Sequence, residues 1–193
     1  MSEPPSAPPT ANPILKLGWK MAASVAVVLI LLLAVGFFLP GTWAAAANRR
    51  LAAPPERVFA LLEDLERWRE WTYWPEEVAF AREGPDRGPG ATRRWDDPSL
   101  GAGSLTITRS EPPGLLAYRV EVDDGALVTE GTFRLQPEAG GTLVTWTEEG
   151  ELGWNPLLAW AALRLGRVQT EELERGLARL EQALLGEAAV PGR

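Results

Sequence analysis

The stretch Thr170–Gly186, TEELERGLARLEQALLG, predicts a long amphipathic helix near the end of this 193-residue chain. Its leucines recur at spacings of four, three and four residues, which places on one helical face Leu173, Leu177, Leu180 and Leu184. Thr170 is a typical N-cap residue, and Gly186 is a typical residue to follow a helix. The leucine face of such a helix must be covered, and the segments before it are the candidates.

Those preceding segments carry the alternating pattern of antiparallel strands that are buried on one face. In the clearest run, Leu116 to Val122, apolar residues alternate with Ala117, Arg119 and Glu121. Similar short runs occur at Val78 and Phe80, Ala91–Trp95, Leu105–Ile107, Leu127–Leu135 and Val144–Trp146. Asp123-Asp124-Gly125 is a hairpin signal, and Gly101-Ala102-Gly103 is also interpreted as a turn. Together these runs predict a six-stranded meander, and Trp43–Leu51 is a candidate seventh strand despite its four alanines.

Two further segments are expected to be helical. Pro54-Pro55 opens a helix whose apolar face includes Val58, Phe59, Leu61 and Leu62. Glu151–Gly166 forms an apolar island around Trp154 and Trp160, and we expect a helix that leads, with a break at Gly166, into the terminal one. This island would either shield a cavity or lie against a bilayer.

A 19-residue uncharged run, Met21–Leu39, is long enough as a helix to cross a membrane. We therefore expect one transmembrane anchor over residues 19–40, with Trp19 and Trp43 at its two edges. The lysines before the run favour a cytoplasmic N-terminus and an extracytoplasmic domain. A cleaved signal peptide is the alternative, because Ala44–Ala47 offers small-residue cleavage sites.

The rest of the expected organisation follows from composition. Residues 1–18 are rich in proline and are expected to form a disordered tail, as are residues 189–193. Residues 41–188 then form one domain. The chain has no cysteine and no histidine, which excludes disulfides, histidine-based triads and Cys/His zinc sites. Its net charge of −7 argues against a nucleic-acid partner, and we expect neither a metal nor a cofactor.

Several stretches resemble the polyketide cyclase/dehydrase-type proteins of the START-like (SRPBCC) superfamily. They are APPERVFALLEDLERWREW (residues 53–71 in this sequence, ending at Trp71), Gly88–Trp95, Gly101–Ile107, Gly141–Trp146 and Glu174–Leu180. The resemblance implies an α+β helix-grip fold, in which a curved antiparallel sheet of about seven strands surrounds a long C-terminal helix. It also implies a hydrophobic small molecule or lipid held between sheet and helix, with catalysis in only some members.

On that reading, aromatic side chains and the terminal helix would form the ligand pocket. The residues expected to bind the ligand are Trp71, Trp74, Trp95, Tyr118, Phe133, Trp146 and Leu177. Trp68 belongs to the same aromatic set, although any single tryptophan more often serves the core. Alternation places Phe133 on the inner face of the sheet and Arg134 on the outer face.

The role of the pocket depends on its polar groups. The candidate acid/base residues are Asp64, Glu70, Glu76, Glu77, Asp96 and Asp97, although the Asp96-Asp97 pair also suits an exposed turn before Pro98. A carboxylate inside the cavity would favour an enzyme, and an entirely apolar cavity would favour a binding protein. A filled core would favour a ligand-free interaction module for a membrane partner.

Overall fold

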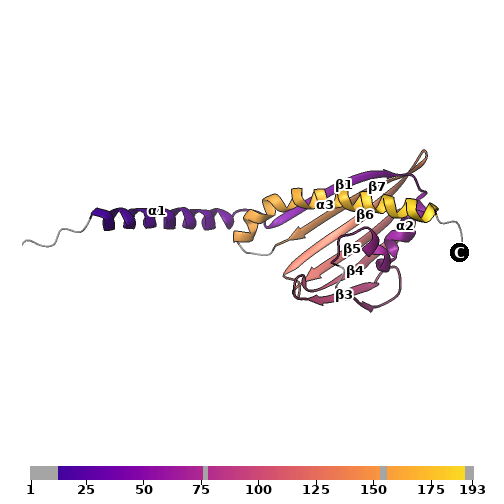
Figure 1. Cartoon of the computed structure of the whole chain (residues 1–193), viewed down its shortest axis with the longest axis horizontal. Coiled ribbons are helices and arrows are strands. Elements are labelled where there is room, and N and C mark those ends of the chain that lie inside the picture. The colour runs from indigo at the N-terminus through magenta and orange to yellow at the C-terminus, as the bar shows by residue number, and fades with distance from the viewer. Residues whose placement is uncertain (1–12, 76–77, 153–155, 190–193) are drawn as a thin grey trace, which may run out of the picture.

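The computed structural model describes residues 13–75, 78–152 and 156–189 of the chain. A seven-stranded antiparallel sheet is crossed on one face by a long C-terminal helix, and a separate apolar helix precedes the first strand (Figure 1). The α+β helix-grip arrangement predicted from the sequence is confirmed.

The sheet has the order β1-β7-β6-β5-β4-β3-β2, so consecutive strands pair except at β1. The strands are β1 Thr42–Leu51, β2 Ala81–Glu83, β3 Thr92–Asp97, β4 Gly101–Glu111, β5 Leu115–Val122, β6 Leu127–Glu138 and β7 Gly141–Glu151. The alanine-rich β1 pairs with β7 along its whole length, from Thr42 opposite Glu151 to Leu51 opposite Thr142. The candidate first strand is therefore confirmed.

Two details of the meander differ from the sequence prediction. Val78 and Phe80 lie before β2 instead of within a strand. Gly101-Ala102-Gly103, interpreted as a turn, is the start of β4. Gly103 pairs with Trp95, and the Trp95 ring lies where a side chain at position 103 would be, so glycine is required inside the strand here.

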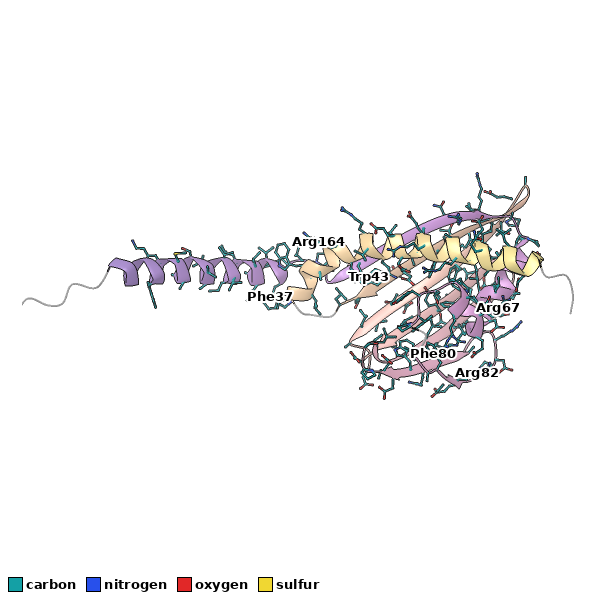
Figure 2. The ribbon with its side chains drawn as sticks, in the orientation of Figure 1. Phe37, Trp43, Arg67, Phe80, Arg82 and Arg164 are labelled. Carbon is teal, nitrogen blue, oxygen red and sulfur yellow. The ribbon has the colours of Figure 1, made fainter. Side chains whose placement is uncertain are left out.

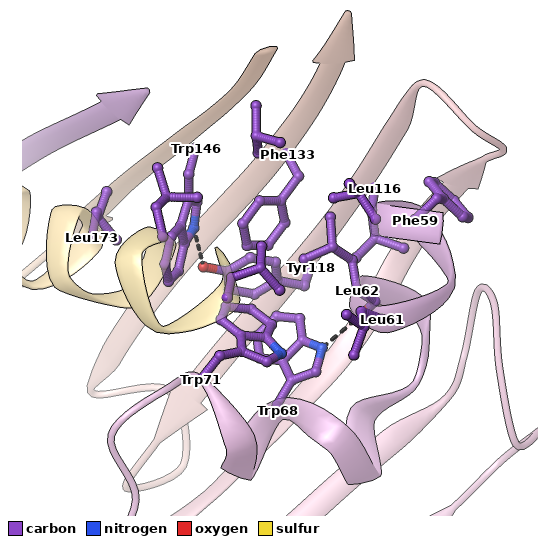
Figure 3. Close-up of a cluster of buried hydrophobic side chains, with 14 of the residues drawn as sticks. Phe59, Leu61, Leu62, Trp68, Trp71, Leu116, Tyr118, Phe133, Trp146 and Leu173 are labelled. Carbon is purple, nitrogen blue, oxygen red and sulfur yellow. Dashed lines mark hydrogen bonds between the residues drawn. The ribbon is translucent and has the colours of Figure 1, made fainter. Parts of the chain in front are cut away.

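One side of the sheet is closed by two short helices, α2 (Pro55–Glu63) and the 3-10 helix η1 (Leu65–Glu70). As predicted, α2 begins at the prolines and buries Val58, Phe59, Leu61 and Leu62. The N–H of the buried Trp68 ring donates to the Leu62 carbonyl oxygen at 2.8 Å, which fixes η1 against α2 (Figure 3).

The C-terminal helix α3 (Pro156–Ala189) is one continuous element of 34 residues. Its predicted leucine face is buried, since Leu173, Leu177, Leu180 and Leu184 are each exposed by 4% or less. The predicted ends and break were wrong. Thr170 is not a cap but bonds the Gly166 carbonyl oxygen within the helix, and α3 continues past Gly186. Gly166 does not break the helix; it lets α3 approach β1, because an added Cβ would lie 2.6 Å from the Ala44 carbonyl oxygen.

The N-terminal helix α1 (Pro13–Gly36) contains one span, Gly18–Gly36, that is long and apolar enough to cross a membrane. The helix begins inside the stretch expected to be a tail, while residues 1–12 and 190–193 of the two expected tails lie outside the described residues. Trp43 does not lie at the edge of this helix as predicted: it is 7% exposed and belongs to the domain core.

Candidate functional site: a cavity between sheet and α3

A cavity of about 490 Å³ lies between α3 and the inner face of the sheet. Most of its wall is apolar, including Trp43 of β1, Leu105 of β4 and Val120 of β5. The α3 side is supplied by Leu165, Val168, Gln169, Glu172, Leu173, Gly176 and Arg179. Larger hollows on the outer face of the sheet are lined by charged side chains such as Arg119, Glu130 and Glu149. The inner cavity is therefore the one suited to an apolar ligand.

Arg179 of α3 lines the cavity and makes hydrogen bonds to the segments around it. Its guanidinium donates to the Trp71 carbonyl oxygen at 2.8 Å and to Glu172 Oε1 at 2.8 Å, so it joins the segment after η1 to α3. Two other lining residues are exposed, Tyr73 by 75% and Val168 of α3 by 57%. These exposed lining residues mark the side on which the cavity opens.

One buried polar cluster interrupts the apolar wall. The Tyr118 hydroxyl donates to Glu148 Oε1, and Gln169 Nε2 of α3 donates to Glu148 Oε2 at 2.6 Å. Trp146 Nε1 in turn donates to the Tyr118 hydroxyl oxygen at 2.8 Å, as the close-up shows (Figure 3). The cluster thus links β5, β7 and α3, and all four side chains line the cavity.

Burial dominates the electrostatics of this cluster. Glu148 is 7% exposed, and burial raises the pKa of its carboxyl group above the usual value, although the bonds from Tyr118 and Gln169 act in the opposite direction. Burial, together with the adjacent Glu148 carboxylate, raises the pKa of Tyr118 well above 10, so the phenol stays protonated and acts as the donor. The cluster therefore places a carboxyl group with a raised pKa at the wall of the cavity.

Strand alternation in β7 points to Glu148, which is not among the candidate acid/base residues named from the sequence. In β7 every second residue from Thr142 to Gly150 faces inward and is buried. Val144 and Trp146 belong to the inward-facing set, and the same alternation continued by one step reaches Glu148. Gln169 could not be placed in this way, because its approach to Glu148 depends on how α3 crosses the sheet.

Three of the seven residues expected to bind a ligand line the cavity together: Trp74, Tyr118 and Trp146. Trp71, Phe133 and Leu177 are each exposed by 1% or less and belong to the aromatic and aliphatic core beside it. In that core the Phe133 ring lies 4.7 Å from the Trp146 ring and 5.8 Å from the Trp71 ring, measured between centroids (Figure 3). These three residues support the wall from behind.

Trp95 occupies a different place. Its ring packs on Trp74 at 5.1 Å and lines a separate hollow near Phe80 and the turn between β5 and β6. Trp68, the further member of the aromatic set, does line the main cavity while being almost fully buried.

None of the described carboxylates that the sequence singled out lines the main cavity, and Asp96 lines the separate hollow beside Trp95. Asp64 accepts the Glu66 N–H at the start of η1, and Glu70 forms an ion pair with Arg67 at 2.7 Å. Asp97 accepts the Ser99 N–H at 2.8 Å in the turn after β3. Glu76 and Glu77 lie outside the described residues, as does Trp154. Among the residues that the structure describes, no group of three or more potential metal ligands occurs.

Comparison with known proteins agrees with this architecture. A family model described as "Polyketide cyclase / dehydrase and lipid transport" matches residues 42–185. No match was found among curated proteins. A protein of Rhizobium leguminosarum is 24% identical, with 74% of this chain and 94% of that chain covered and a TM-score of 0.52. Protein MLL2253 of Mesorhizobium loti is 20% identical, with 75% and 97% covered and a TM-score of 0.54.

A third similar structure is the di-domain ARO/CYC StfQ from the steffimycin biosynthetic pathway. It is 16% identical, with 77% of this chain and 52% of that chain covered and a TM-score of 0.55. At these identities the similarity to solved structures supports the fold alone. The assignment of the chain to a family rests on the match to the family model.

Proposed function

Because the chain belongs to the polyketide cyclase/dehydrase and lipid transport family, we propose that it binds a hydrophobic small molecule or lipid in the cavity between the sheet and α3. The observation that carries this proposal is the cavity itself, which is largely apolar and has a volume of about 490 Å³. That volume lies in the range of small-molecule sites, and a few convergent polar groups in an apolar wall are the usual arrangement for orienting a ligand.

The polar cluster defines the chemistry of such a ligand. Gln169 and Glu148 line the cavity beside each other and can bond a hydroxyl, carbonyl or amine group of the bound molecule. The remaining wall, with residues such as Leu105, Val120 and Leu173, suits a hydrocarbon or ring skeleton. The proposed ligand is therefore mostly apolar with one hydrogen-bonding end.

We also propose that α1 anchors the domain in a membrane as a single-pass helix with a cytoplasmic N-terminus. The supporting feature is β1, because the small-residue sites Ala44–Ala47 lie inside this strand and pair with Glu149 to Trp146 of β7. Cleavage there would divide the strand and remove Trp43 from the cavity wall. The fold thus favours an uncleaved anchor over a signal peptide.

The direct test is analysis of compounds that co-purify with the full chain. Detergent-extracted protein should retain an apolar compound above the detergent background, measured by mass spectrometry after solvent extraction. Val120→Trp, which fills the cavity from β5, should remove most of that compound, whereas Arg134→Trp on the outer face should retain it. Equal retention by both variants would place the bound compound outside the cavity.

A second candidate function, an enzyme acting on an apolar or aromatic substrate, is favoured by one observation. Glu148 is a carboxyl group with a raised pKa at the wall of an apolar cavity, which is how a general acid or base is commonly tuned. The co-purified compound gives the test: an enzyme should convert it, and Glu148→Gln should abolish conversion while binding remains. If the wild-type chain binds the compound and does not convert it, the enzyme function is overturned and the binding function remains.

A further inference from the structure

The first turns of α3 lie alongside the last turns of the apolar helix α1. Trp160 Nε1 donates to the Leu32 carbonyl oxygen at 3.0 Å, and Gly36 at the end of α1 contacts Pro156 at the start of α3. Leu32 is about 6 Å, or one turn, from the end of α1. As Figures 1 and 2 show, this end of α3 extends beyond the sheet to meet α1. If α1 crosses a bilayer, this part of α3 lies at the bilayer surface.

The side chains of this segment, residues 156–168 and hereafter the docking segment, suit that surface. No charged residue occurs from Pro156 to Leu163, and three leucines there are well exposed, Leu157 by 63%, Leu158 by 42% and Leu163 by 58%. The first charges that follow are Arg164 and Arg167, with no acidic residue between Glu151 and Glu171. Apolar residues beside a few cations are typical of segments at the membrane interface.

The docking segment also reaches the cavity. Leu165 and Val168, near its end, line the cavity together with Trp43, which is seven residues after the last residue of α1. Leu127, at the start of β6, belongs to the same end of the sheet. The cavity therefore extends to the end of the domain at which α1 is attached.

From this continuity we propose that the docking segment lies in the surface of the bilayer crossed by α1, so that an apolar ligand enters the cavity from the lipid phase. The proposal rests on the proposed function and on the anchor. It commits to one partner, a lipid bilayer, because the exposed apolar surface is continuous with the span and is bordered by cations.

The depth of the docking segment can be measured directly, because the chain contains no cysteine. Single cysteines at Leu163, Leu185 and Ile30 would carry an NBD label in the full chain, reconstituted in vesicles of phosphatidylcholine and phosphatidylglycerol. Leu185 is the matched control, since it is a leucine on the same helix with a similar exposure, 52% against 58% for Leu163. Brominated phospholipids should quench the label at Leu163 several-fold more than at Leu185, and the label at Ile30 in the span should also be quenched.

The quenching results distinguish membrane anchoring by α1 from contact between the docking segment and the bilayer. Quenching at Ile30 without extra quenching at Leu163 overturns the docking and leaves the anchor intact. Absence of quenching at Ile30 overturns the anchor and the docking together.

Ligand entry has its own test in the same vesicles. A photoactivatable fatty acid in the bilayer should label cavity peptides that contain Tyr73 or Val168. Leu163→Glu should reduce this labelling several-fold, and Leu185→Glu should not. Equal labelling in wild type and Leu163→Glu overturns entry through the docking segment. If the wild-type protein is not labelled but still retains a co-purified compound, only the entry route is overturned. If the wild-type protein is not labelled and retains no compound, the proposed function is overturned.

Discussion

Tyr118 donates its hydroxyl hydrogen to Glu148 across the inner face of the sheet, although the two residues are 30 positions apart in the chain. The pair lies beside an open cavity, yet both side chains are almost fully buried. Since the carboxyl group has lost its water and gained only two donors, the balance between its protonated and ionised forms becomes sensitive to substitution and to pH.

The first prediction concerns the pH dependence of stability. The pKa of Glu148 in the folded protein lies above the value of 4.5 for a free carboxyl group, so folding favours the protonated form. The resulting stabilisation is present below pH 4.5 and is lost as the pH rises through the raised pKa. Thermal unfolding should therefore show Glu148→Gln gaining stability relative to wild type as the pH is increased from about 4 to about 8, a range that covers ordinary and raised carboxyl pKa values. A constant difference between the two across that range would contradict the raised pKa.

The second prediction concerns the Tyr118 hydroxyl group. Tyr118→Phe removes the donor to Glu148 and leaves the Trp146 N–H without its acceptor. Loss of partners for buried polar groups should lower the free energy of unfolding by about 1–3 kcal/mol, measured by denaturant titration. The matched control is Tyr73→Phe at the other tyrosine, which is 75% exposed and should change stability little. Similar losses in the two variants would show that the buried bond contributes nothing specific.

The third prediction tests the grip of α3 on the sheet. Leu177 is 1% exposed, so Leu177→Asp would bury an unpaired carboxylate and should prevent the domain from folding. Leu185→Asp, two turns further along at a position that is 52% exposed, should fold normally. Circular dichroism and protease sensitivity would measure both, and wild-type melting of Leu177→Asp would show that this face is not core.

The fourth prediction separates an anchor from a cleaved signal peptide. A chain that begins at Gly41 keeps the whole of β1, while a chain that begins at Asn48 loses the residues that pair with Glu151 to Trp146 of β7. The longer chain should fold, and the shorter one should be strongly destabilised or insoluble. A stable, cooperative domain beginning at Asn48 would instead support cleavage near Ala47. In cells, alkaline carbonate washing should leave the full chain in the membrane pellet.

Sequence periodicity predicted the fold well, because the leucine spacing of α3 and the alternation in strands such as β5 each indicate a buried face directly. The errors arose where close packing decides the conformation. Gly166 and Gly103 are typical of breaks and turns in isolation, but here each allows a neighbouring segment to approach. Alternation could show which residues point inward, as it did for Phe133, but not whether the space in front of them is filled.

The site was less predictable for the same reason. A cavity is what remains after side chains from many elements have packed, so no local pattern could assign Trp74 to its wall and Phe133 to the core. The inward position of Glu148, the carboxylate at the cavity wall, could be predicted from strand alternation alone. Its donor Gln169 required the crossing of α3 over the sheet.

The short connection between α1 and β1 limits where the domain can act. Only residues 37–41 separate Gly36 from Thr42, and five residues span at most about 17 Å when fully extended. With α1 in a bilayer, the domain cannot travel to a second membrane or into the surrounding solution. Its encounters with a lipid-soluble molecule are then confined to two dimensions, so the concentration that governs occupancy is the amount per area of its own membrane. An anchored domain of this kind would bind its proposed ligand locally, and delivery to another membrane would require a separate carrier.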